Sequence, residues 1–299
     1  MSSAPVTPWP RAVAGIEDAA AVDRLARRVE VPCDAGTIVW RGWNTGEAGD
    51  RGTPVVLLHG GAGSWNHWVR NIAPLVAAGR QVWVPDLPGF GESVRPAGCT
   101  DADALPGPVE AGLRAVLGGA ACDLVGFSFG GMVAGFVAAR FPRRVRRLVL
   151  VGAAGLGISG GRVIPLQPWK HLPEGEARQT VFRSNLAALM LASPGSIDDL
   201  AVALHGSNLS RDRMLKRRIA RTDILRRTLR DTRCPVHGIW GRQDALFLGH
   251  QASVAPALAA APDFRSLAFI AEAGHWVQFE RAPAFDEALA AVLGPSAGR

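Results

Sequence analysis

The segment Leu124–Met132, with the sequence LVGFSFGGM, constrains the fold of this chain more than any other. An apolar run that ends in Gly-x-Ser-x-Gly-Gly and continues in small residues predicts a strand, a sharp turn at Ser128 and a helix. Gly126 and Gly130 lack a Cβ atom, so neighbouring backbone can pass close to the turn. The first helical turn, from about Phe129, directs free N–H groups and a partial positive charge toward the serine. The pattern therefore predicts an exposed serine hydroxyl beside a helix N-terminus.

A serine hydroxyl in such a turn is a candidate nucleophile, and it needs a histidine base that is oriented by a carboxylate. Asp244 follows a strand expected at Val236–Trp240, and His275 follows a strand expected at Arg265–Ile270. Both are therefore expected at carboxyl ends of strands, the rim at which open α/β sheets bind ligands. Two other carboxylates stay open for the orienting role, although neither lies at a strand exit: Asp223 and Asp263.

A glycine-rich loop follows another apolar strand, expected at Val55–His59. Glycines let backbone N–H groups face a ligand at close range. We expect the N–H groups of Gly61 and Phe129 to form an oxyanion hole. His59 precedes the serine turn, and we expect it to fix this loop by hydrogen bonds rather than to act as the base.

Five motifs occur in order along the chain: His59-Gly60-Gly61 after a strand, DLPGFGES at Asp86–Ser93, the Ser128 turn, Gly241-x-x-Asp244 and Gly274-His275. Together they resemble the α/β-hydrolase superfamily over about Thr37–Leu293. The resemblance implies an α/β fold with a mostly parallel central sheet, flanking helices and an inserted helical cap. It also implies a hydrolase whose catalytic triad is Ser128, His275 and Asp244.

Hydrophobic periodicity divides the chain into a lead-in at 1–28, a core at 29–152 and 233–299, and a helical cap insertion at 153–232. Strands alternate with helices in the core, which predicts a parallel sheet. Further strands are expected at Val29–Pro32, Ile38–Trp43, Gln81–Pro85 and Leu148–Val151, and helices at Ile16–Arg28, Asn66–Ala78, Pro108–Leu117 and Gly131–Arg140. The insertion breaks this rhythm with four prolines and with amphipathic helical stretches at Phe182–Leu191 and Arg211–Arg230.

Within the superfamily, four segments look closest to the carbon–carbon bond hydrolases that cleave ring-fission products of aromatic catabolism: 70–76, 151–157, 240–244 and 274–280. Trp276 after the histidine is typical of that group. The group also holds the substrate carboxylate with a lid arginine, but here Leu204 or His205 aligns with that position and Arg211 follows later. The loop Gly60–Trp65 is also shorter than in that group and lacks proline.

The triad and the oxyanion hole serve ester and carbon–carbon cleavage equally, so they do not decide the substrate. The short loop and the missing lid arginine favour hydrolysis of a carboxylic ester or related acyl bond of a small, largely apolar substrate. Trp276 favours the alternative, a carbon–carbon bond hydrolase of ring-fission dienoates. A ligand-binding receptor that retains the triad is a second alternative.

Large side chains from the cap and from the strand exits are candidates for an apolar pocket wall. As a set they predict a site for an acyl or aryl group, although each ring alone fits plain core packing. The set is Trp65, Phe129, Trp169, Phe182, Met190, Phe247 and Trp276.

The composition of the chain limits the kinds of partner that it can be expected to bind. The net charge is +7, but no aromatic residue interrupts the basic stretch Arg211–Arg233, so a stacking platform for nucleic acid is not expected. No apolar run approaches about 18 residues, so no membrane span is expected, and the start Met1–Pro10 lacks the features of a signal peptide. We therefore expect a cytoplasmic enzyme whose partner is a small-molecule substrate, with a homodimer left open.

No metal or cofactor is expected. The seven histidines show no metal-binding spacing, and the four cysteines are widely separated, which fits reduced thiols rather than zinc ligands or disulfides. Gly152-x-x-Gly155-x-Gly157 follows a strand but lacks the G-x-G-x-x-G spacing of a dinucleotide site.

Overall fold

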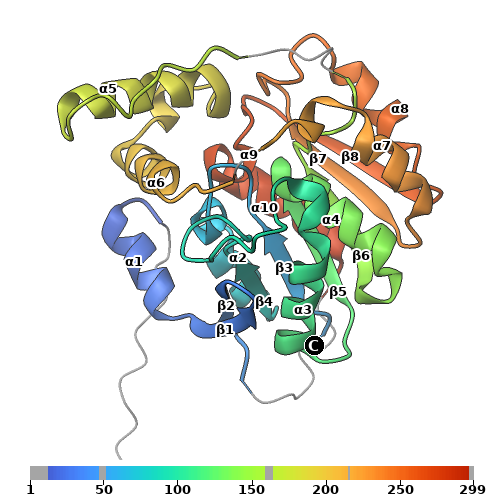
Figure 1. Cartoon of the computed structure of the whole chain (residues 1–299). Helices are drawn as coiled ribbons and strands as arrows, with labels where there is room; N and C mark the ends of the chain where they lie inside the picture. Colours follow the sequence, from blue (N-terminus) through green and yellow to red (C-terminus); the bar gives the residue numbers. More distant parts are fainter. Residues whose placement is uncertain (1–12, 47–51, 159–163, 215, 296–299) are drawn as a thin grey trace, which may run out of the picture.

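The computed structural model describes residues 13–46, 52–158, 164–214 and 216–295 of the chain. Over these ranges an eight-stranded sheet forms the centre of the molecule, in the order β1-β2-β4-β3-β5-β6-β7-β8 (Figure 1). The strands are β1 (Arg27–Cys33), β2 (Gly36–Trp43), β3 (Val55–Leu58), β4 (Val82–Pro85), β5 (Cys122–Phe127), β6 (Val145–Val151), β7 (Val236–Gly241) and β8 (Phe264–Ile270). β2 pairs antiparallel with β1 and β4, and the other neighbouring pairs are parallel. The carboxyl ends of the parallel strands therefore meet along one edge.

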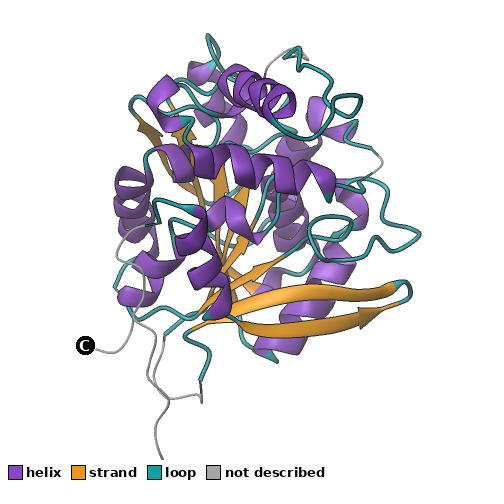
Figure 2. Cartoon of the chain, turned by 90° about the vertical axis from the view of Figure 1, so that its left-hand side faces the viewer, coloured by secondary structure: helices purple, strands orange, loops and turns teal. Residues whose placement is uncertain are grey.

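Helices cover both faces of this sheet (Figure 2). Side chains alternate along each strand, so Val56 and Leu58 of β3 join one buried cluster while Val55 and Leu57 join the other. Helices α3 (Pro106–Leu117), α4 (Phe129–Arg140) and α8 (Val254–Leu258) pack in the first cluster, and α1 (Ile16–Arg24), α2 (Ile72–Ala77), α9 (Val277–Glu280) and α10 (Ala282–Leu293) in the second. Burial on both faces explains why the central strands read as continuous apolar runs.

The eight predicted strands are all present, but two predicted helices are shorter than expected. The helix predicted at Asn66–Ala78 is a 3₁₀ turn, η1 (Trp65–Trp68), followed by α2. Pro74 has no N–H to donate and therefore fits the first turn of α2 but not the interior of a longer helix. The helix predicted at Ile16–Arg28 ends at Arg24, because the chain pairs with β2 from Arg27 onward.

Helix α1 belongs to the part of the chain predicted to be a lead-in, yet it packs directly on the sheet. Val22 is fully buried, and its carbonyl accepts a hydrogen bond of 2.8 Å from the indole N–H of Trp43. Asp23 pairs with Arg41 of β2 at 2.6 Å. The start of the described chain is therefore anchored to the antiparallel end of the sheet.

The insertion between β6 and β7 carries α5 (Glu176–Asn185), the π-helical turn η4 (Leu186–Met190), α6 (Asp199–Ser210) and α7 (Ile224–Thr228). Figure 1 shows α5 and α6 side by side, away from the sheet. None of the helices in the described ranges is long and apolar enough to cross a membrane. The bounds of the cap insertion, 153–232, remain a prediction.

The prediction of a continuous helix at Arg211–Arg230 is wrong. Backbone N–H groups of this segment bond to core loops instead of to their own helical turn: Arg213 to the Gly89 carbonyl at 2.8 Å and Lys216 to the Thr100 carbonyl at 3.1 Å. Helix α6 was not predicted, because apolar and polar residues alternate around it without a clear face. Its one local signal is Asp198, whose carboxylate accepts from the N–H of Ala201 as an N-cap.

Candidate active site

Ser128 lies in the turn between β5 and α4, as the sequence predicted. Its φ of +52° is in the left-handed region, which is costly for a residue with a side chain and is typical of a functional turn. The turn requires close backbone approach, since a Cβ on Gly130 would lie 2.3 Å from the carbonyl oxygen of His59. The N–H of Ser128 donates to the carbonyl of Val151 in β6 at 2.8 Å, which ties the strained residue to the neighbouring strand.

The structure brings together the three residues predicted to form a triad. His275 Nε2 lies 2.9 Å from Ser128 Oγ, and His275 Nδ1 lies 2.7 Å from Asp244 Oδ2. A carboxylate only accepts, so the proton of a neutral imidazole lies on Nδ1 and leaves Nε2 free to accept from the serine. The other Asp244 oxygen accepts from the N–H of Leu246 at 2.9 Å, so both carboxylate oxygens are bonded.

The two alternative acids are held elsewhere. Asp223 pairs with Arg227 at 3.1 Å, and Asp263 pairs with Arg265, each at a partly exposed position. Asp244 is nearly fully buried and is the carboxylate that contacts His275. The geometry therefore supports Asp244 as the orienting group.

Gly152, directly after β6, lies against the contact between Asp244 and His275. Its φ of +49° is in the left-handed region, and a Cβ there would lie 3.3 Å from both Asp244 Oδ2 and the His275 ring. Glycine is needed here both for the backbone conformation and for the space beside the imidazole.

Two buried histidines hold the Gly60 peptide next to the predicted oxyanion hole. His59 Nδ1 donates to the Gly60 carbonyl at 2.8 Å while its Nε2 accepts from the N–H of Leu87 at 2.9 Å. His67 Nδ1 accepts from the N–H of Gly60 at 3.2 Å. Burial lowers the pKa of His59 and holds the pKa of His67 well below its ordinary value, so both rings are neutral. His59 thus makes the loop-fixing contacts that the sequence predicted, whereas His67 was missed.

A cavity of about 420 Å³ opens beside Ser128 and His275. Gly61 and Phe129, the predicted oxyanion donors, both line it. Of the predicted pocket residues, Met190 and Phe247 line it as well. Other apolar residues that were not predicted for the pocket also line it, among them Leu156, Ile158, Leu189, Leu209 and Leu246.

The other four predicted pocket residues do not line this cavity, which corrects the predicted wall. Trp65 packs against Trp43 with ring centroids 5.8 Å apart. Trp169 and Phe182 contact each other in a separate groove beside α5 and α6. Trp276 stacks on Phe279 and donates its indole N–H to the His67 carbonyl at 2.9 Å. A buried indole N–H usually has a hydrogen-bond partner, and for Trp276 that partner lies in the core rather than in the cavity.

Two arginines, Arg217 and Arg221, line the cavity. The Arg211 guanidinium bonds to the carbonyl and hydroxyl of Ser207 and does not line the cavity. Arg217 does line it, and its Nε would lie 3.1 Å from a Cβ built on Gly61. One Nη of Arg217 bonds to Asp212, whereas its buried Nε has no hydrogen-bond partner among the described residues. Arg217 stands in an arginine-rich run, so no local signal distinguished it from its neighbours.

In the part of the chain that the structure describes, no cluster of three or more His, Cys, Asp or Glu side chains is placed to hold a metal ion. The side chains and backbone of the site supply a nucleophile, a base, N–H donors and two guanidinium groups, those of Arg217 and Arg221.

Comparisons with known proteins agree with this geometry. Residues 53–183 match the family model described as alpha/beta hydrolase fold. The chain is 31% identical over 255 residues to the 2-hydroxy-6-oxo-6-phenylhexa-2,4-dienoate hydrolase of Burkholderia cepacia, covering 79% of this chain and 86% of that protein. It is also 31% identical to the 2-hydroxy-6-oxononadienedioate/2-hydroxy-6-oxononatrienedioate hydrolase of Comamonas testosteroni, covering 80% and 87%. Among solved structures, the esterase RhEst1 from Rhodococcus sp. ECU1013 superposes with a TM-score of 0.69 at 25% identity, covering 92% of this chain and 100% of that one.

Proposed function

Because the chain belongs to the α/β-hydrolase family, we propose that it hydrolyses a carbonyl substrate by nucleophilic attack of Ser128. The observation that carries this proposal is the continuous hydrogen-bond chain from Ser128 through His275 to Asp244, at the wall of a largely apolar cavity. A serine hydroxyl next to an oriented, neutral imidazole is the arrangement that acyl transfer requires.

The proposed reaction follows from these contacts. As Ser128 Oγ bonds to the carbonyl carbon, its proton passes to His275 Nε2, and Asp244 stabilises the resulting imidazolium. The carbonyl oxygen becomes an oxyanion that accepts from the N–H groups of Gly61 and Phe129. With an ester, His275 then returns the proton to the leaving oxygen. With a dienoate, a proton first moves from the 2-hydroxyl to C5, so that cleavage of the C5–C6 bond leaves a dienolate whose charge is carried on the C2 oxygen, and His275 returns its proton to this leaving group. In both reactions a water molecule activated by the same imidazole releases the acyl group from Ser128.

For the substrate we propose a carbonyl compound that carries a carboxylate, with carbon–carbon bond cleavage as in the dienoate hydrolases named above. Two observations support this class. Those relatives share about a third of their residues with this chain over most of both lengths, and Arg217 places a guanidinium with an unpartnered N–H at the cavity wall. A charge-assisted bond to a carboxylate would satisfy that N–H. In this proposal Arg217 binds the substrate carboxylate, in place of an arginine at the position of Leu204 or His205.

The second candidate is the carboxylic-ester hydrolase preferred from the sequence. The likeness to the esterase RhEst1 and the apolar wall of the cavity favour it. An uncharged ester would not use Arg217, so this residue separates the two candidates.

The test compares 2-hydroxy-6-oxo-6-phenylhexa-2,4-dienoate with p-nitrophenyl butyrate for the wild-type chain, Arg217→Leu and a matched control, Arg211→Leu. We expect the dienoate to have the higher kcat/KM, and Arg217→Leu to lower its kcat/KM by about 10- to 100-fold while leaving the ester nearly unchanged. Arg211→Leu should change neither. A tenfold advantage of the ester in the wild type, with no effect of Arg217→Leu, would establish the ester hydrolase instead.

A further inference from the structure

The loop that carries Gly61 runs from Gly60 into the first residues of η1, Trp65 and Asn66, and this far end contacts helix α6 of the insertion. Asn208 of α6 is completely buried, and its Oδ1 accepts from Ser64 Oγ at 2.8 Å and from Asn66 Nδ2 at 3.2 Å. Its Nδ2 donates to Asn66 Oδ1 at 2.7 Å. Ser64 and Asn66 are themselves nearly fully buried. One amide on the insertion therefore satisfies the side chains of two loop residues.

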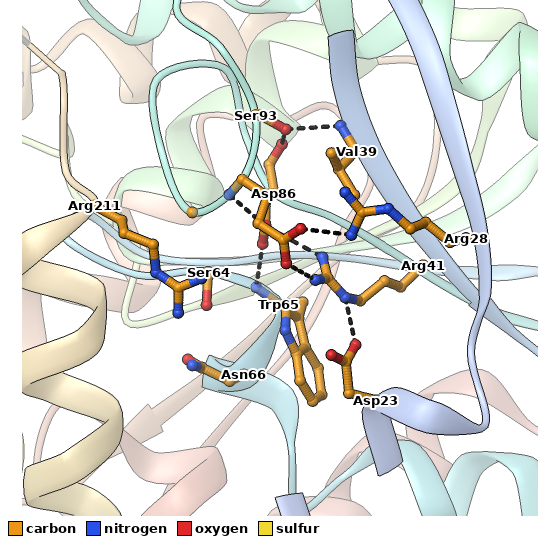
Figure 3. Close-up of polar contacts among 12 residues, drawn as sticks. Asp23, Arg28, Val39, Arg41, Ser64, Trp65, Asn66, Asp86, Ser93 and Arg211 are labelled. Carbon is orange, nitrogen blue, oxygen red and sulfur yellow. Dashed lines mark hydrogen bonds and ion pairs between the residues drawn. The ribbon is translucent and has the colours of Figure 1, made fainter. Parts of the chain in front are cut away.

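The same end of the loop is held from the opposite side by Asp86. Asp86 Oδ1 accepts from the backbone N–H of Trp65 at 2.8 Å, and Oδ2 accepts from the N–H of Glu92 at 2.9 Å and from Arg41 at 3.2 Å (Figure 3). Arg41 is buried in β2 and also pairs with Asp23. The core thus fixes the backbone at Trp65, while Ser64 and Asn66 on either side of it depend on Asn208.

The stretch between the two ends of the loop is strained. His59 and His67 hold the Gly60 peptide at the strand end. Between Gly60 and Ser64, Ala62 has a φ of +47°, in the left-handed region that residues with a Cβ avoid. A loop in this conformation persists only while its surroundings hold it, so loss of an anchor at one end should let the segment with Gly61 relax.

We propose that Asn208 is a positioning residue of the reaction: it keeps Ser64 and Asn66 in place and so holds the Gly61 N–H toward the oxyanion. Helix α6 thereby acts on catalysis through the oxyanion loop and not only as a wall of the cavity. The next residue, Leu209, lines the cavity, so a substrate that packs on this wall contacts the same helical turn that anchors the loop. This inference rests on the proposed serine mechanism but not on the identity of the bond that is cleaved.

The test measures kcat and KM with p-nitrophenyl butyrate and the inhibition constant of an aryl trifluoromethyl ketone, whose serine adduct carries an oxyanion. Asn208→Leu removes all three hydrogen bonds at similar volume. We expect kcat to fall about 10- to 100-fold and inhibition to weaken in parallel, with KM within about threefold, because the missing interaction acts on the oxyanion and not on the bound ester.

The matched control is Asn185→Leu. Asn185 is also a buried amide on an insertion helix, where it bonds to the backbone of Gln167, but it does not touch the oxyanion loop. Both variants should lower the melting temperature, whereas only Asn208→Leu should change kcat and the ketone affinity. An equal loss of kcat in both variants would reduce Asn208 to a stability role and overturn the inference.

Ser64→Ala provides a second route if Asn208→Leu does not fold. It removes one of the three bonds and should lower kcat by a smaller factor with KM unchanged; an unchanged kcat would overturn the inference. Combined with Asn208→Leu, it should add almost nothing, because both changes act through one contact. Ser128→Ala separates the two proposals: its full activity would refute the serine mechanism, whereas an inactive Ser128→Ala beside a fully active Asn208→Leu would refute the positioning role alone.

Discussion

Replacement of Asp244 by Asn tests the orienting carboxylate at nearly constant volume. In the structure, Asp244 uses one oxygen to accept from His275 Nδ1 and the other to accept from the N–H of Leu246. An asparagine can keep the Leu246 bond only by placing its carbonyl oxygen there, which turns its NH₂ toward His275. The imidazole must then accept at Nδ1 and carry its proton on Nε2, where it faces Ser128 and cannot accept the serine proton.

The expected loss follows from this tautomer change. We expect Asp244→Asn to lower kcat by about 10³- to 10⁴-fold, the size of effect known for loss of the orienting carboxylate in a serine triad. At about 1.36 kcal/mol per tenfold in rate, this loss corresponds to about 4 to 5.5 kcal/mol of transition-state stabilisation. KM should change little, because Asp244 lies behind His275 and does not line the cavity.

The assay is steady-state hydrolysis of p-nitrophenyl butyrate, with the melting temperature measured in parallel to confirm folding. Asp263→Asn is the matched control, since it removes a carboxylate from a pair with Arg265 outside the site, and it should keep full activity. A kcat for Asp244→Asn within tenfold of the wild type would show that another group orients the base, and the tautomer argument would be refuted.

Three further predictions concern Gly152, Trp276 and Asp286. Gly152→Ala should lower kcat at least about tenfold, because its Cβ presses on Asp244 and His275, whereas Gly118→Ala, also at positive φ but facing open space, should lower only the melting temperature. Trp276→Phe leaves the buried His67 carbonyl without its donor, and urea unfolding should show a loss of about 1 to 3 kcal/mol. Burial raises the pKa of Asp286 to about 7 from its ordinary 3.8, so the folded chain binds the proton more tightly than the unfolded chain and loses stability as the pH rises from about 4 to 7. Asp286→Asn should remove this loss, and melting curves that keep the wild-type slope would contradict the assignment.

The fold and the triad could be predicted because their signals are local. The strand, turn and helix around Ser128 depend on backbone geometry that only glycine permits at Gly126 and Gly130. Parallel strands run in one direction, so residues that follow strand ends, such as Asp244 and His275, meet at one edge even though 31 positions separate them.

The pocket and its supports could not be predicted in the same way, because they depend on which segments meet across the chain. Ser64 and Asn208 are 144 positions apart, and nothing near either residue indicates the other. Arg211 and Arg217 look alike in the sequence, but the backbone between them bonds to core loops instead of continuing α6, and this turns Arg217 into the cavity. The same reason explains the missed His67.

The sequence by itself determined the order of strands along the chain, the serine turn and the three residues that meet there, since apolar periodicity and glycine positions restrict the backbone directly. Only the tertiary structure decided which side chains line the cavity beside Ser128 and which hold the loop that carries Gly61. A buried tryptophan such as Trp276 can serve either purpose, and the choice depends on where its N–H finds an acceptor, here the carbonyl of His67. That partner exists only once the chain has folded.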